Sequence, residues 1–174
     1  MIAGAIVFLT ANFPLTFLAI GLVASLVAIA RAPAPRSTAL VVDRLIAWHV
    51  FVGLGAANLL NFVFHVFFGR MAAAFIGWAD SPFQLEVGMA SLGFSAVAFV
   101  AAFRSFDLRL AAILGPALFS LGAAAGHAYQ MVVAHNFAPG NAGVIFYTDI
   151  LIPLFGFALL WLQHRHPTAV DRRP

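Results

Sequence analysis

The sequence predicts an all-α protein, an integral membrane bundle of five transmembrane helices. Of its 174 residues, 63% are hydrophobic and only 9% are charged. So few charges cannot cover the surface of a water-soluble domain of this size. Apolar runs of about twenty residues or more recur along nearly the whole chain, as expected for helices that cross a bilayer. The arginines lie almost entirely on alternate connections between these runs, which is typical of a multi-pass topology.

Five apolar segments are predicted as spans. They cover residues 2–30, 45–69, 83–103, 108–134 and 142–162. The first has no positively charged residue before it and is too long for the apolar part of a signal peptide, so we expect it to be retained as a helix. The domain organisation that follows is a transmembrane domain at 1–163 and a polar cytoplasmic tail at 164–174.

The distribution of arginine predicts the orientation. If the N-terminus is outside, eight of the nine arginines fall on the cytoplasmic side and only Arg70 falls on the outer side. Cytoplasmic loops are enriched in positive charge. We therefore expect the N-terminus outside, the C-terminus in the cytoplasm, and a multi-pass location in a prokaryotic inner membrane. An odd number of spans puts the two termini on opposite sides of the membrane, which agrees with this orientation.

Several local features predict architecture. The outer connection at 70–82 contains Phe75 and Trp78 and is too apolar for a free loop, so we expect a short amphipathic or re-entrant segment in the headgroup region. Gly122 and Gly126 form a GxxxG element, which favours close packing of two helices. A proline inside a helix removes a backbone hydrogen bond, so Pro14 and Pro153 are candidate kinks.

Composition also limits the partners. The chain has no Cys, which excludes disulfides and thiolate metal ligands. Its arginines are scattered over short connections, so no nucleic-acid binding is expected. The predicted partners are the lipid bilayer, a small-molecule ligand, and further copies of the chain or a larger membrane complex.

Four ionisable side chains lie inside otherwise apolar segments, each on a different span: His65, Glu86, His127 and Asp149. At ~1.5 Å rise per residue, each lies roughly 6–10 Å from the same membrane face. A charge at the centre of a membrane helix costs roughly 2.5–3.5 kcal/mol on insertion scales, so such groups usually face one another, a cavity or a ligand. The sequence therefore predicts one polar pocket near the outer face.

The leading interpretation is a pocket for a metal ion or a small ligand. Imidazole and carboxylate ligands suit Zn, Mn or Fe. Asn61 and Gln130 are expected to hydrogen-bond these ligand side chains. Four alternatives stay open: a purely structural hydrogen-bond network, a proton- or ion-coupled transporter, a b-type haem ligated by His65 and His127, and a structural subunit of a complex. Enzymatic activity also stays open, although the sequence shows no nucleophile–base pair and no phosphate-binding loop. His49 lies on the helical face opposite Asn58 and is predicted to be interfacial.

Four segments carry a resemblance to a known family. They are GWADSPFQLEVG at 77–88, GHAYQM at 126–131, NFAPGNAG at 136–143 and YTDILIP at 147–153. Together they resemble a group of small multi-pass prokaryotic membrane proteins classed as a domain of unknown function. The resemblance covers roughly residues 61–153. It implies a membrane location and supplies no activity or cofactor.

Overall fold

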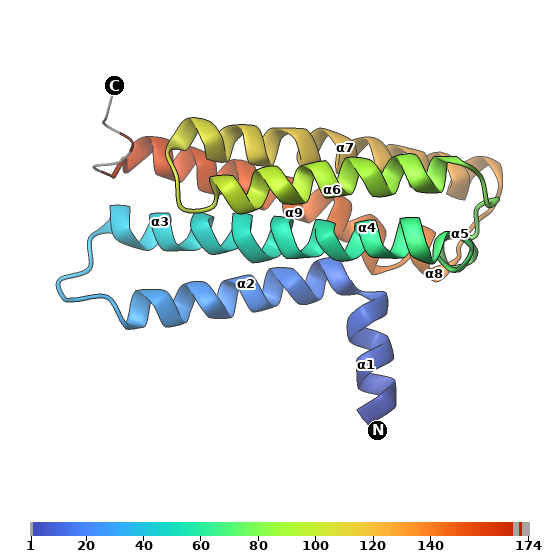
Figure 1. Ribbon diagram of the computed structural model, residues 1–174, viewed down its shortest axis with the longest axis horizontal. Helices are drawn as coiled ribbons and strands as arrows, with labels where there is room; N and C mark the ends of the chain where they lie inside the picture. Colours follow the sequence, from blue (N-terminus) through green and yellow to red (C-terminus); the bar gives the residue numbers. More distant parts are fainter. Residues whose placement is uncertain (1, 169–170, 172–174) are drawn as a thin grey trace.

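The computed structural model describes residues 2–168 and 171, and this part of the chain is helical with no strand. Its helices run alongside one another as an elongated bundle (Figure 1). Five helical stretches are long and apolar enough to cross a membrane: Phe13–Ala30, Thr38–Phe67, Phe83–Ala101, Phe106–Val133 and Pro139–Arg165. The five predicted spans are thereby confirmed by length and composition.

The second span is one continuous helical stretch with an irregular centre. It consists of α3 (Thr38–Trp48), the π-helix η1 (His49–Ala56) and α4 (Ala57–Phe67). Ser37 begins it as an N-cap, since its side chain accepts a hydrogen bond from the Leu40 N–H at 3.2 Å. The π-helical turns contain one more residue than α-helical turns, so they change which residues share a face.

The first predicted span is wrong at its N-terminal end. Residues 2–30 were expected as one helix, but α1 (Ile2–Ala11) and α2 (Phe13–Ala30) are separate, and α1 points away from the bundle (Figure 1). Pro14 lies in the first turn of α2, where it cannot donate to a preceding carbonyl. The Thr16 hydroxyl donates to Leu9 O at 2.9 Å instead. Only the α2 part is long enough to span.

The two ends of the bundle differ in structure and charge. At one end lie the α1–α2 break, the short helix α5 (Gly69–Ile76) and the single turn α8 (Pro139–Ala142), so part of the connection at 70–82 is helical. At the other end lie the α2–α3 connection, the turn from α6 (Phe83–Ala101) to α7 (Phe106–Val133), and the end of α9 (Val144–Arg165). Arg70 belongs to the first end. All other described arginines belong to the second: Arg31, Arg36, Arg44, Arg104, Arg109 and Arg165.

Close helix packing is found between α4 and α6 rather than at the GxxxG element. A Cβ on Gly88 of α6 would lie 2.5 Å from Val66 Cγ2 of α4, so this contact requires glycine. The Asn61 amide donates to Ser91 Oγ at 2.8 Å across the same interface. By contrast, nothing lies within 4 Å of a Cβ on Gly122. The GxxxG expectation was therefore wrong, because that face of α7 meets no neighbouring helix closely.

The apolar core occupies the half of the bundle nearest the arginine-rich end. Ile46, Val50, Ala98, Ile113 and Leu159 are fully or nearly fully buried there. Arg109 is also buried in this half, with its Nη1 2.9 Å from Asp43 Oδ1 of α3. The core thus fills one half of the bundle, and the opposite half is less densely packed.

A hydrogen-bonded carboxylate anchors the C-terminal tail at the arginine-rich end. Asp171 accepts hydrogen bonds from the backbone N–H groups of Phe106 and Thr168, the Thr168 hydroxyl and the Gln163 amide, at 2.8–2.9 Å. Burial alone would raise the pKa of Asp171, but these hydrogen bonds outweigh it and lower the pKa below its ordinary value. The start of α7 and the end of α9 are connected through this one side chain.

Candidate functional site

A cavity of about 520 Å³ occupies the half of the bundle opposite the core. Side chains of α1, α2, η1, α4, α5, α7 and α9 surround it. Most of its wall is apolar, and residues of α5 such as Ala72 and Phe75 close it toward the end that carries α5 and α8. A site of this size and lining is typical of pockets for small organic molecules.

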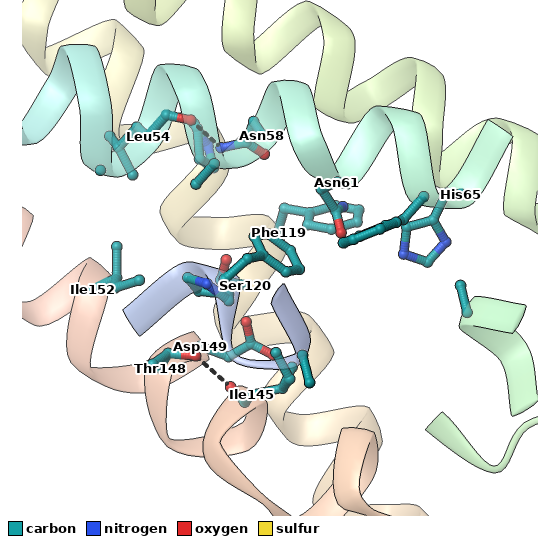
Figure 2. A pocket seen from close by; sticks show the side chains of 18 of the residues that line it. Leu54, Asn58, Asn61, His65, Phe119, Ser120, Ile145, Thr148, Asp149 and Ile152 are labelled. Carbon is teal, nitrogen blue, oxygen red and sulfur yellow. Dashed lines mark hydrogen bonds between the residues drawn. The ribbon is translucent and has the colours of Figure 1, made fainter. Parts of the chain in front are cut away.

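Polar side chains from three spans reach this cavity. Figure 2 shows Asn58, Asn61 and His65 of α4 facing Ser120 of α7 and Asp149 of α9 across the space. Asn58 donates to Leu54 O at 2.9 Å and Thr148 donates to Ile145 O at 2.9 Å, so both are partly satisfied by their own helices. The remaining polar atoms are available to a ligand.

Two of the four predicted residues form a pair. His127 Nε2 lies 3.5 Å from Asp149 Oδ2, which connects α7 to α9. Asp149 lines the cavity, while His127 lies behind it and is 5% exposed. The predicted contact between these two spans is therefore present in the structure.

Asn141 determines which ring nitrogen of His127 faces Asp149. Its Nδ2 donates to His127 O at 3.2 Å and to Asn136 O at 2.9 Å. Its Oδ1 must then be the acceptor, both for Trp78 Nε1–H at 2.9 Å and for His127 Nδ1 at 2.8 Å. His127 thus carries a proton on Nδ1 and turns Nε2 toward Asp149.

The other two predicted residues lie elsewhere. His65 lines the cavity, and its Nδ1 lies 2.6 Å from Oε1 of Gln84, not close to the other three. Glu86 is exposed in the first turn of α6, where the positive end of the helix dipole favours a carboxylate. Asn61 lines the cavity as well as bonding Ser91, whereas Gln130 is half-buried on α7 and lies outside the lining.

The expected convergence of four ligands is consequently not found. Within residues 2–168 and 171, no group of three or more His, Asp or Glu side chains is placed to hold a metal ion. The physical reason is that Glu86 can lie at the helix end in contact with the polar interface and has no need of a buried partner. We therefore correct the four-residue metal site formed by His65, Glu86, His127 and Asp149 to one imidazole–carboxyl pair and one separate imidazole.

The haem alternative does not fit these residues. Both ring nitrogens of His127 are engaged, by Asn141 and by Asp149, and His127 does not line the cavity. Ligation of one iron by His65 and His127 would require the pair with Asp149 to break.

Three residues of the site were missed or misplaced from sequence. Gln84 is the partner of His65, and Asn141 is fully buried at the centre of the network. Both are uncharged amides, so they gave no signal in a search for ionisable groups. His49 was predicted to be interfacial but is 2% exposed and lines the cavity.

Comparison with known proteins identifies a family but no activity. The sequence profile of DUF6790, a family of unknown function, matches residues 11–169. The chain belongs to this family. The resemblance to a family of unknown function is confirmed, over a longer range than residues 61–153. No match was found among curated proteins or among solved structures.

Proposed function

We propose that this DUF6790 protein is a membrane-embedded binding protein for a small amphipathic organic molecule. The observation that carries the proposal is the cavity of about 520 Å³, apolar over most of its wall, with Asn58, Asn61, Ser120 and Asp149 on its polar side. An apolar wall with a few polar groups is what a ligand with an apolar body and a polar group requires. The polar group would bind on the Asp149 side.

The proposal places the site on one side of the membrane. On the arginine-rich side of the cavity the bundle is filled by the core around Ile46, Ala98 and Leu159, and Arg109 there is already paired with Asp43. A route for ions or polar substrates would need polar groups along its whole length. This packing favours binding within one leaflet over transport, and the distribution of arginine favours the outer leaflet.

Co-purification of the ligand tests the proposal. Protein is purified in lipid nanodiscs, extracted with organic solvent, and the extract is analysed by mass spectrometry against empty nanodiscs. Ala72→Trp adds a large side chain to the cavity wall, whereas Ala74→Trp places the same side chain on the exposed face of the same helix. Wild type and Ala74→Trp should retain an organic molecule, and Ala72→Trp should retain at least fivefold less.

Two outcomes would contradict the proposal. The first is that wild type retains nothing above empty nanodiscs. The second is that both tryptophan variants retain equal amounts while each remains folded and monodisperse.

A further inference from the structure

His49 is a buried polar side chain without a partner. Its ring is 2% exposed, and neither Nδ1 nor Nε2 has a hydrogen-bond partner among the described residues. It lines the cavity at the start of η1, about eleven residues from the arginine-rich end of its span. Leaving a buried polar group unpaired costs roughly 1–3 kcal/mol, so such a group in a native structure needs an explanation.

The surroundings of His49 enclose its ring closely and give it no hydrogen bond among the described residues. The Phe155 ring meets it edge-on with centroids 5.1 Å apart. A Cβ on Gly53 would lie 3.1 Å from His49 Nδ1, and a Cβ on Gly156 would lie 3.3 Å from Nε2. Two glycines thus leave room for the imidazole on two different helices. A larger residue at either position would press against a ring nitrogen.

The π-helix brings His49 into the cavity. Asn58 follows His49 by nine positions. In an unbroken α-helix at ~3.6 residues per turn, this offset would place the two side chains about 180° apart around the helix axis. The wider turns of η1 advance by a smaller angle per residue, and both side chains line the same cavity. Short π-helical segments are often found at functional sites, and here the segment begins at the unpaired histidine.

We propose that His49 hydrogen-bonds a polar group at the deep end of the ligand. This inference rests on the proposed function and specifies the class of ligand. No charged side chain lines the cavity beside His49, and the only carboxylate in the lining is Asp149. The deep group is therefore uncharged, a carbonyl or a hydroxyl. A ligand with hydrogen-bonding groups at both ends of an apolar body satisfies both His49 and the polar side chains nearer α5.

Two matched probes test this assignment. 1,4-Naphthoquinone carries two carbonyl groups at opposite positions of one of its two fused rings, whereas 1-tetralone has a similar bicyclic skeleton with a single carbonyl. The chain has no Lys and no Cys, so the quinone meets no side-chain amine or thiol with which to form an adduct. Binding is measured by equilibrium dialysis of protein-containing nanodiscs against empty nanodiscs, which corrects for partition into lipid.

Wild type should bind the quinone roughly 3–10-fold more tightly than the tetralone, the factor expected for one additional hydrogen bond. His49→Phe should reduce this preference to about one. If the phenyl ring of this variant prevents folding, His49→Leu is measured in its place, with the same expected result. His49→Gln keeps a donor and an acceptor and should retain part of the preference. His166→Phe, on an exposed residue beyond α9, should leave it unchanged.

The outcomes distinguish this assignment from the proposed function. Equal affinity of wild type for the two probes, no binding of either probe, or a preference that persists in both His49→Phe and His49→Leu would overturn the role of His49 and leave the proposed function standing. The proposed function is tested separately, by ligand retention in wild type and by its loss in Ala72→Trp but not in Ala74→Trp.

Discussion

At the scale of single residues, Asn141 is the centre of the hydrogen-bond network beside the cavity. It is fully buried, and its one amide group makes hydrogen bonds to the side chains of Trp78 and His127 and to two backbone carbonyl oxygens. It thereby orients the imidazole that lies behind Asp149. An apolar residue of similar size would fill the same volume and satisfy none of these groups.

We expect Asn141→Leu to lower the free energy of unfolding by about 2–4 kcal/mol, because several buried donors and acceptors lose their partners together. The measurement is unfolding by titration with SDS, followed by tryptophan fluorescence. Asn12→Leu is the control, since the Asn12 amide lies between α1 and α2 and donates to the nearby Phe8 O of α1. Equal stability of the two variants would show that the network around Asn141 contributes little.

Sequence reasoning succeeded at this scale where a residue had no alternative to burial. Asp149 and His127 lie deep within their helices and are paired, as predicted. Glu86 lies in the first turn of its helix, where exposure was possible, and a count of charges could not distinguish the two situations. His49 was misplaced because a uniform helical period of about 3.6 residues was assumed through η1.

At the scale of elements, the contact between α4 and α6 depends on small residues and hydrogen bonds. Gly88 and Ser91 of α6 lie against α4, and the Ser95 hydroxyl donates to Gly55 O of η1 at 2.8 Å. In a membrane, helices associate through close van der Waals packing and interhelical hydrogen bonds of this kind. Asn61, which bonds Ser91, and His65, which bonds Gln84 of α6, are held by this contact at the wall of the cavity.

Gly88→Leu should destabilise the protein by roughly 1–3 kcal/mol, because the added side chain overlaps Val66 and forces α4 and α6 apart. Gly122→Leu adds the same side chain at an exposed position of α7, where nothing lies within 4 Å, and should change stability little. Melting temperatures of both variants in one detergent provide the comparison. A larger loss for Gly122→Leu than for Gly88→Leu would contradict this description of the packing.

The elements themselves were largely predictable, whereas their contacts were not. Long apolar runs identified all five spans, since only a helix satisfies its backbone within a bilayer. The GxxxG element indicates that a helix could approach closely and says nothing about which neighbour it meets. The break near Pro14 was visible in sequence as a candidate kink, yet its size depends on what packs against α1 and α2.

At the scale of the whole molecule, charge should determine orientation. The described arginines other than Arg70 gather at the end of the bundle opposite α5 and α8. From the positive-inside tendency we expect the arginine-rich end in the cytoplasm and the cavity nearer the outer face of the bilayer. Access to the site would be from the outer leaflet or the outer aqueous phase.

Because the chain has no Cys, single-cysteine variants can test this orientation without background labelling. Ala79 and Ala34 are exposed in connections at opposite ends of the bundle. On intact cells, a membrane-impermeant maleimide should label Ala79→Cys and should label Ala34→Cys only after permeabilisation. The reverse pattern would place the cavity in the cytoplasmic leaflet and contradict the predicted topology.

The most direct test of the binding proposal is a crystal structure of the protein grown from a lipidic mesophase, without added ligand. We expect continuous electron density for a non-protein molecule in the cavity, with one end within hydrogen-bonding distance of Asp149 or Asn58 and the other within reach of His49. A cavity that has closed by side-chain repacking, or that contains only ordered water, would contradict the account.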